Sequence, residues 1–203
     1  MKHFIIEKDK SYTFSDYFKL DPPIRELLDY FGYSYQINEY QFPEKAPTDM
    51  QYFSGLHKQL KGHIQYVNLN NEIARRESLI APVLFKVALY LKIRVDIEYP
   101  VKVNHQLKGK IDYFMRRENN LLIVEAKKAD LQRGFTQLAV ELIALDKWFD
   151  EDNKSLYGIV TMGELWRFGI LNRQTKVIIQ DMNLFRVPAD LDELLQVLLT
   201  ILA

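Results

Sequence analysis

The stretch from Leu107 to Trp148 constrains the fold more than any other part of the chain. Residues 107–116 and 121–127 are rich in apolar and aromatic side chains, and the polar run 117–120 between them is typical of a turn. Asp130 then follows and can cap a helix that runs to about Phe149. The apolar face of that helix consists of Phe135, Leu138, Leu142, Leu145 and Phe149. The sequence therefore predicts a β-hairpin followed by an amphipathic helix.

Two carboxylates and one amine interrupt the apolar pattern of this hairpin. Side chains alternate between the two faces of a strand, so Glu125 and Lys127 share a face with Leu121 and Ile123. Asp112 stands between two apolar neighbours on the first strand. Acidic and basic side chains are rarely buried unpaired, and residues of an antiparallel hairpin meet across the pair. We therefore expect the three groups to converge at one end of a small sheet.

This set of side chains suits metal-assisted phosphodiester hydrolysis. Asp112 and Glu125 supply the hard oxygen ligands that Mg²⁺ prefers, with water and substrate phosphate filling the other positions. A metal ion at such a site polarises a phosphodiester and acidifies a bound water. Lys127 can orient that water or stabilise the charge that develops on the phosphate.

These residues resemble the pattern of the PD-(D/E)xK nuclease superfamily. That pattern is an Asp at the start of a hairpin and then Glu-x-Lys on the second strand, here Glu125-Ala126-Lys127. Twelve residues separate Asp112 from Glu125, which suits a hairpin, and Ile111 stands where the pattern often has Pro. The alternative is that the Glu-x-Lys sequence belongs to a solvent-exposed strand edge and has no catalytic role.

A second stretch carries a related resemblance. Residues 157–171 read YGIVTMGELWRFGIL. They resemble the hairpin after the second helix in the nuclease domain of type I restriction motor subunits and related uncharacterised proteins. Together the resemblances cover about residues 71–179. They imply a restriction endonuclease-like α/β fold, Mg²⁺ or Mn²⁺ as cofactor and DNA as the substrate.

The resemblance also implies one more carboxylate from a preceding helix. Asn70 or Asn71 can cap a helix from Glu72 to about Leu91. Its apolar stripe consists of Ile73, Ile80, Leu84, Val87 and Leu91. Glu77 lies on that stripe, so we expect it to face the core and act as the third metal ligand, with Glu72 as second choice. Either can instead be a solvated charge, and Glu72 also suits a helix N-terminus.

Other residues near the motif have supporting roles in this prediction. Gln137 matches a Gln that some families of the superfamily place on this helix to hold the site or the substrate. Glu141 stands where the recombination-exonuclease branch has Tyr, which argues against that branch. Gly109, shortly before Asp112, is typical of a bulge or a close backbone approach. The candidate phosphate contacts, each of which can equally be a solvated charge, are Arg75, Arg76, Lys108, Lys110, Lys128 and Arg133.

The expected order of elements is αβββαββ, which indicates an α/β fold with a mixed central β-sheet flanked by helices. Further strands are expected at 93–103, 156–161, 165–171 and 177–180, and Asp190 can cap a C-terminal helix. Residues 1–66 differ in composition, since they hold 14 of the 26 aromatic residues. Helices are expected there over 13–18, 22–32 and 48–60. We therefore divide the chain into a helical N-terminal extension, residues 1–66, and a nuclease-like domain, residues 67–203.

The aromatic residues of the N-terminal zone have two interpretations. They could form a stacking platform for single-stranded bases, or they could form part of the core. The core is favoured, because few Lys or Arg residues interleave with them.

Composition narrows the classes of function. Lys+Arg and Asp+Glu each number 27, which argues against a chain that coats nucleic acid and leaves a local basic patch as the means of binding DNA. The absence of Cys excludes disulfides and zinc–thiolate sites, and the four His residues lack ligand spacing. No run is long and apolar enough for a membrane span or a signal peptide, so we expect a cytoplasmic protein.

Two functions remain at this stage. The first is a metal-dependent DNA nuclease, acting as a homodimer or with a separate motor or specificity partner, since the sequence shows no motor motif. The second is a binding or assembly module that keeps the nuclease fold without turnover. Metal affinity at Asp112 and Glu125 distinguishes the two.

Overall fold

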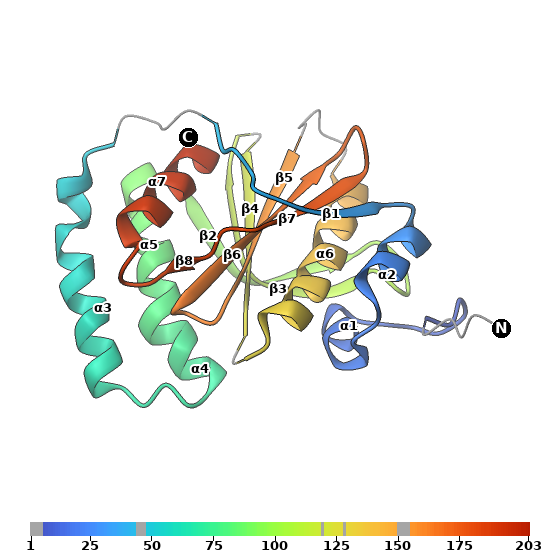
Figure 1. Ribbon diagram of the computed structural model, residues 1–203, viewed down its shortest axis with the longest axis horizontal. Coiled ribbons are helices and arrows are strands. Elements are labelled where there is room, and N and C mark those ends of the chain that lie inside the picture. Colours follow the sequence, from blue (N-terminus) through green and yellow to red (C-terminus); the bar gives the residue numbers. More distant parts are fainter. Residues whose placement is uncertain (1–5, 44–47, 119, 128, 150–154) are drawn as a thin grey trace.

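The computed structural model describes residues 6–43, 48–118, 120–127, 129–149 and 155–203. A mixed sheet runs through the centre, with helices on both of its faces (Figure 1). Its strand order is β1-β7-β6-β5-β4-β3-β2, and β8 pairs with β6. The strands are β1 (Ser34–Asn38), β2 (Arg94–Lys102), β3 (Lys108–Arg117), β4 (Asn120–Ala126), β5 (Ser155–Thr161), β6 (Leu165–Asn172), β7 (Val177–Asp181) and β8 (Phe185–Arg186). The predicted α/β class with a mixed, helix-flanked sheet is confirmed.

The hairpin and the crossover that follows it set the geometry of the centre. β3 and β4 are antiparallel, with Tyr113 opposite Val124. β4 and β5 are parallel and are joined through helix α6 (Leu131–Trp148). The side chain of Asp130 accepts a hydrogen bond from the backbone N–H of Arg133, so the predicted cap is present. A parallel pair requires such a crossover, and this one lays α6 across the sheet beside β4 and β5.

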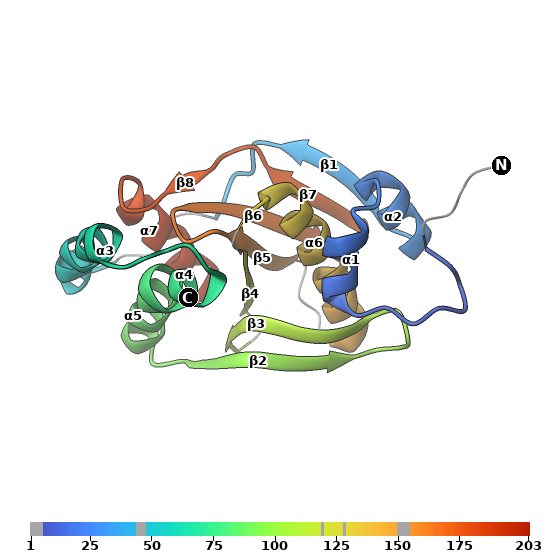
Figure 2. The same ribbon diagram turned by 90° about the horizontal axis from the view of Figure 1, so that it is seen from below.

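Helices cover the two faces of the sheet in two separate groups (Figures 1 and 2). α1 (Phe14–Leu20) and α2 (Ile24–Phe31) lie with α6 on one face. The opposite face carries a short 3₁₀ helix (Met50–Phe53), α3 (Ser54–Tyr66), α4 (Glu72–Arg75), a π-helical turn (Arg76–Ile80), α5 (Ala81–Leu91) and α7 (Leu191–Leu202). Alternation along β4 sends Leu121 and Ile123 toward α6, and Leu122 and Val124 toward α5 and α7.

The N-terminal zone is part of the main fold. Its aromatic residues are buried in the two cores, among them Tyr12, Phe14, Tyr17, Tyr35 and Phe53, as the favoured interpretation expects. The expected helical N-terminal extension also contains a strand, however, because Ser34–Asn38 forms β1 and pairs in parallel with β7. β1 is an edge strand with one buried side chain, so it has no apolar alternation by which to recognise it.

None of the helices in the described ranges is both long enough and apolar enough to cross a bilayer.

Candidate active site

Most of the predicted site residues line one cleft of about 440 Å³. Its walls come from the start of α1, from α4 and the π-helical turn, from β2 to β4 and from α6. The residues that line it are Thr13, Phe14, Ser15, Glu72, Arg76, Glu98, Gly109, Lys110, Asp112, Glu125, Lys127 and Gln137. The structure therefore brings together Asp112, Glu125, Lys127 and Gln137, which the sequence places up to 25 residues apart.

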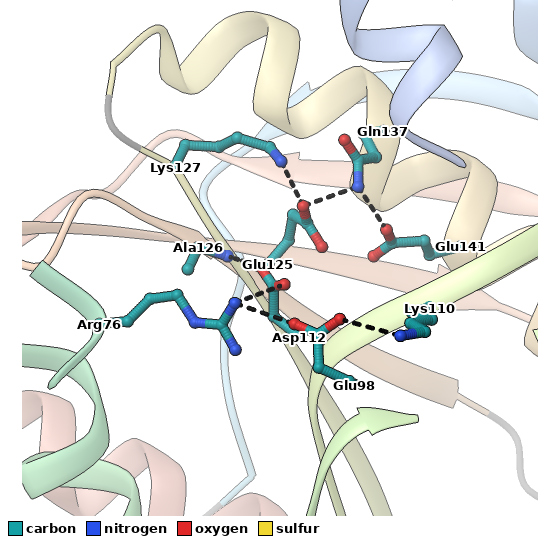
Figure 3. A network of polar contacts seen from close by, with 9 residues as sticks. All are labelled: Arg76, Glu98, Lys110, Asp112, Glu125, Ala126, Lys127, Gln137 and Glu141. Carbon is teal, nitrogen blue, oxygen red and sulfur yellow. Dashed lines mark hydrogen bonds and ion pairs between the residues drawn. The ribbon is translucent and has the colours of Figure 1, made fainter. Parts of the chain in front are cut away.

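Glu125 is the centre of a buried hydrogen-bond network (Figure 3). Its position in β4 turns the side chain toward α6, and the residue is only 2% exposed. Its Oε1 accepts hydrogen bonds from the ammonium of Lys127 and, at 2.6 Å, from Nε2 of Gln137. The same Gln137 amide donates to Glu141 Oε1 at 2.8 Å, because residues four apart on α6 face the same way.

Asp112 joins β3 to β4 and to the helix wall. Its Oδ2 accepts a hydrogen bond from the backbone N–H of Ala126 at 2.8 Å. Its Oδ1 lies 3.4 Å from Nη1 of Arg76, which also donates to Oε1 of Glu98 at 2.9 Å. Asp112 thus faces the cleft with one oxygen fixed by the backbone and the other paired to an arginine (Figure 3).

The donor set fits a hard divalent cation. Glu125 Oε2 and Glu141 Oε2 are buried with no other polar group of the described chain donating to them, and the two carboxyl groups lie close enough to interact with each other. Buried carboxylate oxygens of this kind usually bind a proton, a water or an ion. Within the same ranges, no three acidic or His side chains form a ready-made metal cluster. Mg²⁺ is commonly held by one or two carboxylates plus water and substrate phosphate, which Asp112 and Glu125 can provide.

Burial shifts the proton affinity of the whole cluster. It raises the pKa of Glu125 well above the usual range, and the nearby charges of Glu141 and Asp112 raise it further. Burial also raises the pKa of Asp112, against the opposing influence of the Ala126 N–H and Arg76. For Lys127, burial lowers the pKa, but the Glu125 carboxylate more than offsets this, so the amine stays charged. The site therefore combines Lys127, which stays positively charged, with the carboxyl groups of Glu125 and Asp112, which can gain or lose a proton.

The helix carboxylate at the cleft is Glu72, and the expectation that Glu77 faces the core is wrong. Glu77 is exposed and lines a separate groove beside α3 and α5. Ile73, expected on the same apolar stripe, is 71% exposed. The physical reason is the π-helical turn at Arg76–Ile80, which inserts one extra residue and rotates the preceding turn relative to α5. Extrapolating a 3.6-residue period backward from Ile80 therefore selects the wrong side.

The candidate phosphate contacts divide between the cleft and other surfaces. Only Arg76 and Lys110 of those described line the cleft, and Lys110 lies 3.8 Å from Glu98 at its rim. Arg75 binds the carbonyl of Met162 and the carboxylate of Glu164. The others lie elsewhere: Arg133 pairs with Asp21 and Asp130, Lys108 is partly buried outside the lining, and Lys128 falls outside the described residues.

Helix α1 contributes to the cleft, which the sequence pattern does not indicate. Gly109 has φ 154°, and a Cβ there would lie 2.7 Å from the ring of Phe14, so the expected close approach involves this helix. The hydroxyl of Tyr17 donates to the carbonyl of Gln106 at 2.8 Å and anchors α1 beside β3. Lys127 lies 5.0 Å from the centre of the Phe18 ring, which shields its ammonium. No local signal relates residues 13–18 to the hairpin.

Glu141 is the other missed residue. It is fully buried, and burial raises its pKa to about 7. A signal existed in the sequence, because Glu141 is flanked on both sides by apolar residues, 138–140 before it and 142–145 after it. Glu141 also lies four residues after Gln137, beside the apolar face of the helix, and polar residues in that position are usually solvated.

Glu141 makes stability depend on pH in a testable way. Its folded pKa of about 7 exceeds the ordinary 4.5, so its contribution is fully present below 4.5 and is lost as pH rises through 7. Each pH unit over which this proton is lost lowers the free energy of unfolding by about 1.4 kcal/mol. Glu141→Gln should flatten this decline. Urea unfolding in EDTA, near pH 5 and above pH 7, measures it.

The exposed Glu193 on α7 provides the control, since Glu193→Gln should leave the pH dependence as in the wild type. An unchanged decline in Glu141→Gln would show that other groups cause it.

This chain has no match among protein-family models, curated protein sequences or solved structures. The likeness to PD-(D/E)xK nucleases therefore rests on Asp112, Glu125, Lys127, the elements that carry them and the sequence of residues 157–171.

Proposed function

We propose that this chain is a Mg²⁺- or Mn²⁺-dependent deoxyribonuclease of the PD-(D/E)xK, restriction endonuclease-like type. The observation that carries the proposal is the convergence of Asp112, Glu125 and Lys127 from one hairpin with Gln137 from the following helix. The order of α5, β2, β3, β4, α6, β5 and β6 supports the same type, since it corresponds to αβββαββ.

Each residue has a distinct role in this proposal. Asp112 and Glu125 would hold the cation, with Glu72 as the assisting carboxylate of the helix wall. When bound, the cation polarises a phosphodiester and makes a bound water more acidic. Lys127, whose ammonium is shielded but charged, orients the attacking water or stabilises negative charge on the phosphate. Gln137 fixes the orientation of the Glu125 carboxylate through its amide N–H.

One observation favours a second candidate function. Arg76 and Lys127 already lie against Asp112 and Glu125, so these two proposed ligands each have an internal counterion. That pairing suits a catalytically silent nuclease-fold module that binds or assembles without metal. The nuclease is preferred because Glu125 and Glu141 are two acidic groups buried beside each other, an arrangement that a purely structural network would be expected to avoid.

Incubation of the wild-type chain with supercoiled plasmid DNA tests the nuclease. Relaxed or linear products should form with millimolar Mn²⁺ and not with EDTA. A folded chain that leaves both plasmid and end-labelled linear DNA intact in Mn²⁺ would favour the silent module.

A further inference from the structure

Arg76 occupies an unusual position at the edge of the cleft. It begins the π-helical turn, and such turns are frequent at functional sites. Its guanidinium contacts Glu98 Oε1 at 2.9 Å and Asp112 Oδ1 at 3.4 Å (Figure 3). It also lies 5.2 Å from the centre of the Tyr113 ring. Both acidic contacts use the same nitrogen, Nη1, so Nη2 and Nε lie outside these two ion pairs.

Glu98 is the second unusual feature of this wall. It adopts φ 56° in the middle of β2, a left-handed conformation that is unfavourable for a residue other than Gly. The register pairs Ile97 with Tyr113 and Tyr99 with Ile111, which places Glu98 opposite Asp112 without pairing them. Strained residues of this kind cluster at functional sites. The carboxylate of Glu98 faces the basic residues Arg76 and Lys110.

The guanidinium of Arg76 can bind more than the carboxylate of Glu98. A guanidinium presents a planar fork of N–H donors that matches phosphate oxygens, and arginine is favoured where that recognition matters. Of the basic residues that line the cleft, Lys127 is committed to Glu125 and Lys110 stands exposed at the rim. Arg76 is therefore the partly buried cation best placed to receive an anionic ligand.

We propose that Arg76 binds a phosphate oxygen of a DNA strand in the cleft, and that Glu98 is the positioning residue that holds its guanidinium there. This inference rests on the proposed function, because it takes DNA as the ligand. In the free chain Arg76 neutralises Asp112. When Asp112 binds another group, the guanidinium of Arg76 leaves Asp112 and binds a phosphate oxygen. The ion pair with Glu98 keeps Arg76 at the cleft during this exchange.

The test measures DNA binding in EDTA by fluorescence anisotropy, with a short fluorescein-labelled DNA at low salt. The reference chain carries Asp112→Asn, so that Arg76 no longer has an acidic group to neutralise there. In that background, Arg76→Met should weaken binding about tenfold and lower the salt slope by about one. The adjacent Arg75→Met is the matched control, since Arg75 binds Met162 and Glu164 away from the cleft, and it should change binding less than twofold.

The role of Glu98 is tested by a double-mutant cycle in the same background. Glu98→Gln should weaken DNA binding when Arg76 is present. Combined with Arg76→Met, it should have no weakening effect, because the residue that it positions is gone. A purely structural or long-range charge effect would change the affinity by the same factor in both cases.

Equal losses in the two arginine variants, or no loss in Arg76→Met, would overturn the assignment of Arg76. If Glu98→Gln changes the DNA affinity by the same factor with and without Arg76, the positioning role of Glu98 is wrong. If circular dichroism shows that Arg76→Met does not fold, Arg76→Lys replaces it. That variant keeps the charge without the fork and should bind about threefold more weakly, so undiminished binding would overturn the proposal. If the reference chain binds no DNA, the proposed function fails with it; if only the arginine prediction fails, the proposed function stands.

Discussion

Asp112→Asn should lower metal-dependent DNA cleavage by about a thousandfold while leaving the chain folded. The substitution removes a charged ligand, yet the side-chain oxygen of Asn can still accept the hydrogen bond from the Ala126 N–H. Arg76 loses one partner and keeps Glu98. Rates of plasmid nicking in saturating Mn²⁺ measure the loss, and circular dichroism measures the fold.

Lys127→Ala should abolish cleavage as well. Its removal leaves the Glu125 carboxylate without a counterion, but the raised pKa of that group allows it to take up a proton instead. Asp192→Asn is the control for both variants, because Asp192 is exposed on α7 and pairs only with His57 among the described residues. Cleavage within tenfold of wild type in Asp112→Asn, or loss of helical circular dichroism at room temperature, would show that the residue is structural.

The largest effect on stability is expected at Asp146, which does not line the cleft. Its carboxylate accepts hydrogen bonds from Tyr33 at 2.5 Å, Arg173 at 2.7 Å and Lys176 at 2.6 Å. These bonds outweigh burial, which alone raises the pKa of Asp146, so the group is held below its usual pKa and remains ionised. They join the chain before β1 to α6 and to the turn between β6 and β7.

Asp146→Ala should therefore lower the free energy of unfolding by about 3–5 kcal/mol, because it leaves the poorly exposed cation of Arg173 without its acid. Urea unfolding measures the change. Asp29→Ala, at an exposed position on α2, should change the same quantity by less than about 0.5 kcal/mol. A loss below about 1 kcal/mol for Asp146→Ala would show that water replaces the three hydrogen bonds.

The hairpin and its site could be predicted because their signals are local. The face shared by Glu125 and Lys127 follows from the two-residue period of a strand, and the cap at Asp130 fixes where α6 begins. Once α6 returns over β4, Gln137 must come close to Glu125. The sequence therefore contained both the elements and the convergence of these side chains.

The remaining features depend on tertiary packing, which no local pattern encodes. The π-helical turn changes which helix carboxylate faces the cleft, from Glu77 to Glu72. The strained conformation of Glu98 and the burial of Glu141 follow from neighbours on other elements. Strand β1 forms because β7 offers it a free edge.

Thermal melting tests most directly whether Asp112 and Glu125 form the site of a divalent cation. Millimolar Mn²⁺, compared with EDTA, should raise the melting temperature of the wild-type chain by roughly 5 °C or more, since a ligand that binds only the folded state stabilises it.

The variants decide where the ion binds. The rise should nearly vanish in Asp112→Asn and Glu125→Gln and should shrink in Glu72→Gln, which lines the same cleft. It should persist in Glu77→Gln, the matched helix carboxylate in the separate groove. Equal stabilisation by Mn²⁺ in all of these chains, or none in the wild type, would contradict a metal site in this cleft.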